Sequence, residues 1–242
     1  MPGQARLYQG DFGWYVGRRI VPAIALALAP TAAYGLERIP LEGGGVVAAN
    51  HFSGIDHPLI GSFSPRPLKF LAKAELIEIP VLGFVLRWLG VFGIRRGESD
   101  REAVRRAREL VKAGDLVCVH IEGTRQRLGY PGPVHTGGLM IAMQEGVPVI
   151  PLGLDTFRWS PSNRRKCAIV WGESIDLSEF PRNRGGYARA SEVVRAEMIR
   201  LWRQAAQAAA AGLPPELPDG TKRYGPITGW SRDGAGPSSL AD

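Results

Sequence analysis

The sequence has 242 residues, 45% of them apolar, which is enough to bury the core of one large domain. Its net charge of +7 comes from 30 Lys and Arg against 23 Asp and Glu, and 25 of these 30 cations are arginines, so the sequence favours either a phosphate-bearing partner or a solvated basic surface. Cys118 and Cys167 are the only cysteines and form no C-x-x-C pair, which argues against a zinc site or a disulfide framework and predicts no metal.

The first element is an apolar segment at 20–33, "IVPAIALALAPTAA", which follows Arg18 and Arg19. Its 14 residues are too few to span a bilayer as a helix. Three interpretations remain: a helix lying in the membrane interface, which the flanking Trp14 and Tyr15 favour, a buried core helix, or a cleaved signal. We therefore expect 1–35 to form an N-terminal helical segment that associates with the membrane.

Apolar runs then alternate with amphipathic stretches along the chain. Strand-like runs lie at 46–49, 68–71, 90–94, 116–121, 147–154 and 167–171, and helical patterns lie at 100–112, 138–145 and 187–211. This alternation predicts an α/β domain over 36–212, with a mostly parallel sheet flanked by helices. Residues 213–242 are dense in Gly, Pro, Ser and Asp and are expected to form a flexible tail.

Common nucleotide-binding and nucleic-acid-binding patterns are missing from the sequence. It has neither a G-x-G-x-x-G motif nor a phosphate loop. The arginines are dispersed and are not interleaved with aromatic residues, so no nucleic-acid partner is predicted.

The first residues suited to catalysis directly follow the run at 46–49. His51 stands where a parallel strand ends, and Asp56 falls near the start of the next predicted helix. A turn between them can bring the carboxylate to one imidazole nitrogen and leave the other as a general base. Ser53 lacks a G-x-S-x-G elbow, which argues against a hydrolase nucleophile, and His57 has no assigned role. The alternative is ordinary strand-end and helix-cap chemistry.

Three further blocks follow, each at an apolar run: "GIRRG" at 93–97, "IEGTR" at 121–125 and "VPVIPLGLD" at 147–155. Together with "NHFSGID" at 50–56, they resemble, in order and approximate spacing, the four blocks of the lysophospholipid (1-acyl-glycerol-3-phosphate) acyltransferase family. The resemblance covers about 36–172 and implies that 36–212 is an acyltransferase domain with the glycerolipid acyltransferase-like fold.

The resemblance implies a role for each block. His51 and Asp56 of the H-x4-D motif would be the general base and the residue that orients it, with backbone amides near 52–56 as candidate oxyanion donors. The acceptor hydroxyl, and not an enzyme side chain, would attack the thioester of an acyl-CoA or acyl carrier protein, so no cofactor beyond this co-substrate is expected. The substrate-binding residues would be Arg95, Arg96 and Gly97 for the phosphate, Glu122, Gly123, Thr124 and Arg125 for the glycerol and phosphate parts, and Pro148 for the pocket wall.

The family pattern also predicts partners and a location. We expect a lysophospholipid acceptor, above all lysophosphatidic acid, at an anionic membrane surface, with the protein peripheral on the cytoplasmic face. Glu122 and Arg125 remain open to a structural ion pair, and Arg95 or Arg96 to pairing with surface carboxylates.

Two departures from the family pattern affect the acceptor. His120-Ile121 stand where the family usually has Phe-Pro, and His135 and Thr136 stand where it usually has lysines. Another lyso-lipid, amino-acid-derived or glycolipid, therefore stays open as the acceptor. A non-catalytic protein that binds anionic lipid is the alternative from another functional class.

Overall fold

The computed structural model describes residues 9–94, 100–211 and 223–224. In chain order its elements are α1 (Gln9–Leu28), β1 (Thr31–Tyr34), the short 3-10 helix η1 (Leu36–Arg38), β2 (Gly45–Ala49), α2 (Asp56–Ser62), β3 (Leu68–Lys73), α3 (Ala74–Glu78), α4 (Pro80–Trp88), β4 (Val91–Ile94), α5 (Asp100–Lys112), β5 (Leu116–His120), α6 (Gly137–Glu145), β6 (Val149–Asp155), β7 (Cys167–Trp171), α7 (Arg184–Ala211) and β8 (Arg223–Tyr224). Each predicted strand and helix is present, with ends that differ by a few residues.

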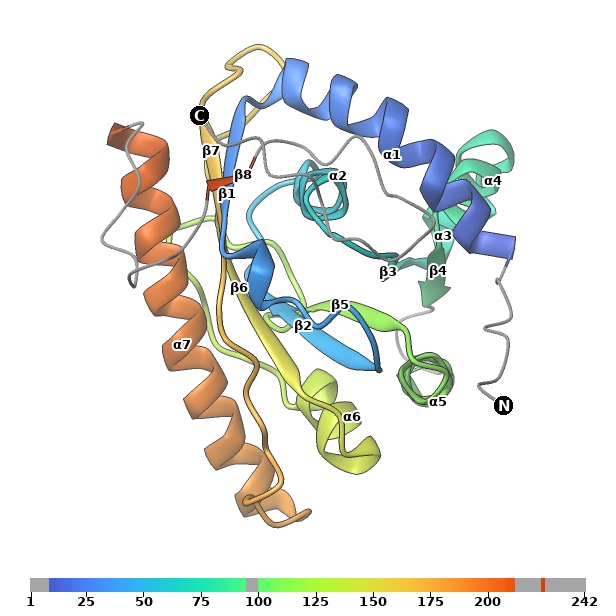
Figure 1. Cartoon of the computed structure of the whole chain (residues 1–242), viewed down its shortest axis with the longest axis vertical. Coiled ribbons are helices and arrows are strands. Elements are labelled where there is room, and N and C mark those ends of the chain that lie inside the picture. Colours follow the sequence, from blue (N-terminus) through green and yellow to red (C-terminus); the bar gives the residue numbers. More distant parts are fainter. Residues whose placement is uncertain (1–8, 95–99, 212–222, 225–242) are drawn as a thin grey trace.

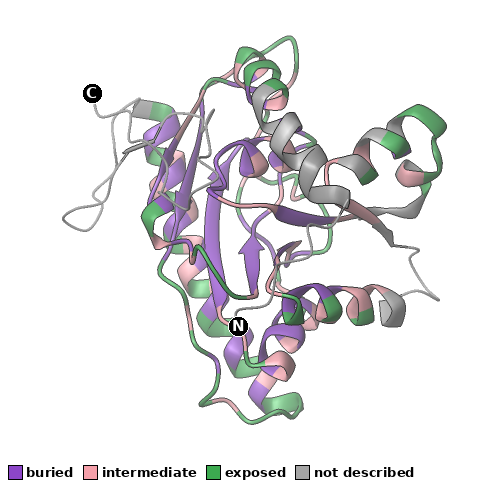
Figure 2. Cartoon of the chain, turned by 45° about the vertical axis from the view of Figure 1, so that its right-hand side comes forward, coloured by how far each residue is buried: buried purple, intermediate pink, exposed green. Residues whose placement is uncertain are grey.

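The strands form one sheet in the order β4-β3-β5-β2-β6-β7-β1-β8 (Figure 1). The pairs from β4 to β6 and the pair of β1 with β7 are parallel, whereas β6–β7 and β1–β8 are antiparallel. The predicted mostly parallel sheet is thus confirmed. Strands β2, β6 and β7 are buried along their whole length, as their near-continuous apolar sequences require (Figure 2).

Alternate residues of the central strands supply two cores on opposite faces of the sheet. Val47 and Ala49 of β2 belong to the core beneath α1 and α2, while Val46 and Ala48 belong to the core beneath α5, α6 and α7. This division follows from the period of two along a strand. The long α7 packs along β6 and β7 and covers the second face (Figure 1).

The segment 1–35 was expected to be helical, but its last residues form a strand. Helix α1 ends at Leu28, and Thr31–Tyr34 form β1, which pairs with β7 and β8 inside the sheet. The sheet therefore begins before the predicted domain boundary at 35 and 36. Among the described residues, no helix combines the length and the apolarity needed to cross a membrane.

The predicted tail includes one ordered pairing. Arg223 and Tyr224 form β8, antiparallel to Tyr34 and Ala33 of β1. The other residues of the predicted tail at 213–242 lie outside the described part of the chain.

Candidate active site

His51 and Asp56 meet at the carboxyl edge of the sheet. Strand β2 ends at Ala49, and α2 starts at Asp56, so the chain turns between the two side chains. The Nδ1 atom of His51 lies 2.7 Å from Oδ2 of Asp56. Because an ionised carboxylate only accepts hydrogen bonds, Nδ1 carries the proton and Nε2 is the nitrogen that can accept another. This is the contact that the five-residue spacing predicted, and we call His51 and Asp56 the dyad.

Asp56 is fully buried and holds the turn together. Its Oδ2 also accepts the backbone N–H groups of Phe52 at 2.8 Å and Ser53 at 3.0 Å. Its Oδ1 accepts the hydroxyls of Ser53 at 2.8 Å and Thr156 at 2.5 Å. Burial alone would raise the pKa of Asp56, but the hydrogen bond from His51, the nearby His120 and His51 rings and the Thr156 hydroxyl lower it to about 2. Asp56 is therefore a carboxylate at neutral pH.

These bonds change one expectation for the turn and agree with another. The amides of Phe52 and Ser53 were candidate oxyanion donors, but both are already used on Asp56. Ser53 is no nucleophile in this geometry, because its hydroxyl donates to the same carboxylate that holds His51. It supports the dyad instead.

Glu122, which lies just after the neighbouring strand β5, holds the backbone of His51 in place. It is 2% exposed, and its Oε2 accepts the His51 N–H at 2.7 Å while its Oε1 accepts the Gly132 N–H at 2.6 Å. Burial raises the pKa of Glu122 to about 7, and the two backbone N–H groups oppose that rise. The structure records no ion pair between Glu122 and Arg125, both within its described part. Glu122 thus braces the turn.

Gly123, Thr124 and Arg125 of the third block are exposed. Gly123 has a φ of 68°, in the region that favours glycine, and Thr124 and Arg125 face solvent. A Cβ added at Gly54 would lie 3.5 Å from the Arg125 guanidinium, so this cation stands over the loop between His51 and Asp56. Three arginines were predicted to bind the substrate. Of these, Arg125 lies within the described residues, and it stands beside the dyad.

Of the remaining predicted residues, three lie outside the described part of the chain and one lies away from the dyad. Arg95, Arg96 and Gly97 lie outside the described residues; β4, which precedes them, is separated from β2 by β3 and β5. The prediction that Pro148 forms a pocket wall at the active site is corrected. Its carbonyl accepts the N–H of Val46, at the start of β2. Because β2 and β6 are parallel, Pro148 stands at the amino edge of the sheet, and His51 at the carboxyl edge.

Two further histidines surround His51. The ring of His120 stacks on His51 with centroids 4.0 Å apart and planes 15° apart, and the ring of His57 meets both at an angle. Burial, the neighbouring His51 and Arg125 lower the pKa of His57 to about 4, against the opposing effect of Asp56. We call His51, His57 and His120 the histidine cluster. The sequence marked His120 only as a departure from the family pattern, and Thr156, 100 residues from Asp56, carried no signal.

A metal ion at His51, Asp56 and His120 would compete with hydrogen bonds that these side chains already make. Potential ligand atoms of His51, Asp56 and His120 lie within 4.8 Å of one another. Both Asp56 oxygens, however, already accept hydrogen bonds, and Nδ1 of His120 lies 2.7 Å from the Asn50 carbonyl. This arrangement suits proton transfer better than metal binding, and the absence of a metal remains a prediction.

An apolar pocket of about 110 Å³ adjoins the histidine cluster. It is lined by Gly17, Val21, Pro22, His57, Pro58, Gly61, Ser62, Phe70, Leu86, Leu89 and Val91. These residues come from α1, α2, β3 and β4 and from α4 and the residue just after it. His57 belongs to both the pocket and the cluster, so apolar ligand atoms in the pocket would lie close to the dyad.

Comparison with known proteins identifies the family of the part of the chain that contains the dyad. The model of the family described as Acyltransferase matches residues 31–155, from β1 to the end of β6. A chloroplastic 1-acyl-sn-glycerol-3-phosphate acyltransferase of Brassica napus is 36% identical over 123 residues, which are 50% of this chain and 36% of the relative. A lyso-ornithine lipid O-acyltransferase of Pseudomonas aeruginosa is 33% identical over 107 residues, 44% of this chain and 41% of the relative. This chain thus spans less than half of the length of either relative.

The fold has a similar solved structure. The crystal structure of the 1-acyl-sn-glycerophosphate acyltransferase PlsC from Thermotoga maritima superposes with a TM-score of 0.65 at 28% identity. The match covers 79% of this chain and 80% of that one.

Proposed function

The chain belongs to the acyltransferase family, and from that premise we propose that it transfers a fatty acyl group from a thioester to the free hydroxyl of lysophosphatidic acid, which yields phosphatidic acid. The observation that carries the proposal is the 2.7 Å contact of His51 Nδ1 with the buried Asp56 carboxylate, within the region of the family match. The donor is an acyl-CoA or an acyl carrier protein, and no cofactor is involved.

The dyad supports direct transfer between the two substrates. Nε2 of His51 takes the proton of the acceptor hydroxyl as its oxygen bonds to the thioester carbonyl carbon. The tetrahedral intermediate then collapses, the carbon–sulfur bond breaks, and the leaving thiolate takes the proton back from His51. Asp56 stabilises the imidazolium in between, as in a serine-protease dyad whose hydroxyl belongs to the substrate. The exposed guanidinium of Arg125, above the same turn, is suited to the acceptor's phosphate.

The apolar pocket supports a fatty acyl substrate. Its volume of about 110 Å³ corresponds to about four water-sized groups, enough for a short run of methylenes. Its wall at His57 adjoins the His51 ring, with ring centroids 5.6 Å apart. We assign this pocket to the part of an acyl chain nearest the thioester.

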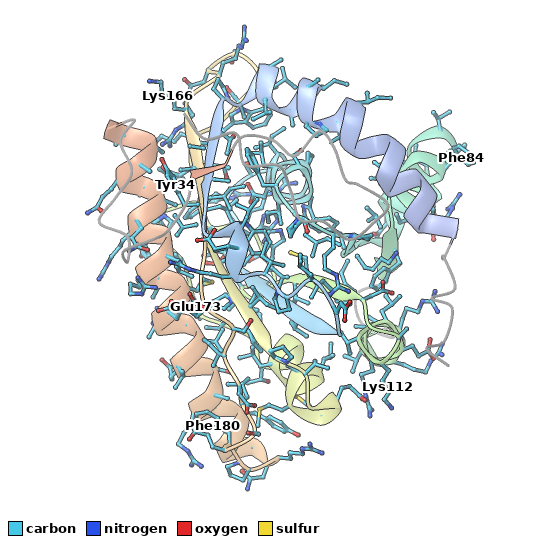
Figure 3. All side chains as sticks on the ribbon, in the orientation of Figure 1. Tyr34, Phe84, Lys112, Lys166, Glu173 and Phe180 are labelled. Atoms are coloured by element: carbon cyan, nitrogen blue, oxygen red, sulfur yellow. The ribbon has the colours of Figure 1, made fainter. Side chains whose placement is uncertain are left out.

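A peripheral position on the cytoplasmic face of an anionic membrane is part of the proposal. Ile20 and Ile24 of α1 are 55% and 57% exposed, and Val81 and Phe84 of α4 are 78% and 66% exposed. Helices α1 and α4 contact each other and both line the apolar pocket; Figure 3 marks Phe84 at the edge of the molecule. Exposed apolar side chains next to an apolar pocket favour a lipid surface as the partner.

The acceptor headgroup has a second candidate. His135 and Thr136 replace the usual lysines of the family, and one similar relative is named a lyso-ornithine lipid O-acyltransferase. An amino-acid-derived lyso-lipid is therefore the alternative acceptor.

An acceptor screen tests the proposal. Purified protein is supplied with palmitoyl-CoA and, in turn, lysophosphatidic acid, lyso-ornithine lipid and a lyso-glycolipid, and both free thiol and lipid product are measured. We expect the highest kcat/KM with lysophosphatidic acid. Preference for lyso-ornithine lipid would move the function to the alternative, and vesicle binding with no thiol release from any acceptor would favour a non-catalytic lipid-binding protein.

A further inference from the structure

His120 is anchored beside the dyad by the backbone of the neighbouring strand. In the β2–β5 register Ala49 pairs with His120, so the His120 ring emerges next to the residues that follow β2. Its Nδ1 lies 2.7 Å from the carbonyl oxygen of Asn50 and donates to it, since a carbonyl only accepts. The Asn50 side chain in turn donates to the Leu154 carbonyl and accepts the Leu154 N–H, each at 2.9 Å. The anchor is thus fixed to β6 as well.

The anchored ring covers one face of the catalytic base. The planes of His51 and His120 are 15° apart at a centroid distance of 4.0 Å. A single hydrogen bond to Asp56 fixes one atom of the His51 ring and leaves the ring free to tilt about that atom. A second flat ring against its face removes this freedom.

His120 provides this support without a competing charge. Withdrawal of its ring from water and the nearby His57 and His51 rings hold the pKa of His120 well below its usual range, against the opposing effects of Asp56 and the Asn50 carbonyl. A neutral ring does not oppose the positive charge that forms on His51 when it takes the acceptor's proton. With Nδ1 protonated, the neutral ring leaves Nε2 as a buried acceptor with no hydrogen-bond partner in the described chain.

We propose that His120 is a positioning residue for acyl transfer: stacked on His51 and anchored on the Asn50 carbonyl, it holds the His51 ring in the plane where Nε2 meets the acceptor hydroxyl. This inference rests on the proposed function. It assigns to His120 a role in the orientation of the base, with no contact to either substrate.

Three substitutions separate the stack from the anchor. His120→Ala removes both and should lower kcat by about 10- to 100-fold, since a small misplacement of a reacting group is enough for such a loss, while the KM of both substrates changes by less than about threefold. His120→Phe keeps a ring on His51 and should recover most of kcat. His120→Asn keeps a donor near the Asn50 carbonyl without the ring and should recover less.

A matched control accounts for general destabilisation. Val117 is fully buried on the same strand but belongs to the core on the other side of the sheet, so Val117→Ala should lower the melting temperature and leave kcat within about twofold. Full kcat in His120→Ala, or equal losses of kcat in Val117→Ala and His120→Ala, would overturn the proposal.

A spectroscopic measurement separates failure of the inference from failure of the proposed function. The chain has four histidines, so the Cε1 proton of His51 can be identified by its loss in His51→Ala. In the wild type the His120 ring current shields this proton; the resonance should move downfield in His120→Ala and stay upfield in His120→Phe. If the resonance does not move, the inference fails even in an active enzyme. If the wild type transfers no acyl group to any acceptor, the proposed function fails, and with it the role of His120 in transfer.

Discussion

The turn that carries His51 and the apolar pocket are built by opposite means, although His57 directly follows the turn and lines the pocket. Asp56 in the turn accepts five hydrogen bonds, from His51, Phe52, two groups of Ser53, and Thr156. The pocket is lined almost entirely by apolar side chains and glycine. Directional bonds fix the position of a reacting nitrogen, whereas apolar contacts accept any chain that fits. Substitutions in the turn should therefore change kcat, and those in the pocket KM.

The largest effect is expected at the carboxylate that orients His51. Asp56→Asn puts an amide beside Nδ1 and weakens the preference for the Nδ1-protonated ring, so kcat should fall by about 10²- to 10⁴-fold with a small change in KM. Steady-state kinetics with palmitoyl-CoA measure both constants. Asp155→Asn is the control, since Asp155 is also buried but binds Arg165 at 2.6 Å, and it should keep its kcat. Comparable losses in the two variants would contradict the special role of Asp56.

The lowered pKa of His57, which lines the pocket and belongs to the histidine cluster, predicts that the folded protein loses stability in acid. Its pKa is about 4 in the folded chain against 6.5 for an ordinary histidine, so between pH 6.5 and pH 4 the unfolded chain binds a proton that the folded chain does not. The free energy of unfolding should therefore fall across that window by up to about 3 kcal/mol from this residue.

His57→Gln isolates this contribution. Glu122, whose raised pKa of about 7 acts in the opposite direction as pH falls from 7 to 4.5, is common to both proteins and cancels in their difference. Denaturant unfolding from pH 7 to pH 4 should give a smaller decline for the variant. Parallel curves for the two proteins would mean that His57 is no source of the acid sensitivity.

The brace at Glu122 should matter for both stability and rate. In Glu122→Gln one side-chain oxygen becomes an NH₂ group, so either the His51 N–H or the Gly132 N–H loses its acceptor. An unsatisfied buried N–H costs about 1–3 kcal/mol, and kcat should fall with the displacement of His51. Glu173→Gln is the control, because Glu173 is 79% exposed in its pair with Arg38 and should contribute less than about 1 kcal/mol. Chemical denaturation compares the two, and an equal cost would contradict the brace.

The smallest effect is expected in the pocket. Leu86→Trp adds bulk to the pocket wall and should raise the KM for palmitoyl-CoA several-fold while leaving short-chain donors unaffected. Val193→Trp, on the exposed side of α7, is the control. A uniform change across donors of all chain lengths would place the acyl chain elsewhere.

The contrast also explains which parts of the site were predictable from the sequence. His51 and Asp56 are five residues apart, so a single turn decides their contact, and the strand-then-helix pattern places that turn. His120 reaches His51 through the register of β5 on β2, and Thr156 through the end of β6; periodicity does not encode such registers. Pro148 was assigned to the pocket wall through the family resemblance alone, and its position just before β6 places it at the amino edge of the sheet, away from His51. The strand β1 was not predicted, because its residues continue the apolar run of α1.

The central claim is that His51 is the general base of acyl transfer, and the kcat of His51→Ala tests it most directly. With palmitoyl-CoA and the preferred lyso-lipid, the variant should retain the wild-type fold by circular dichroism and lose about 10²- to 10⁴-fold in kcat. A folded His51→Ala protein that transfers acyl groups at the wild-type rate would contradict the claim.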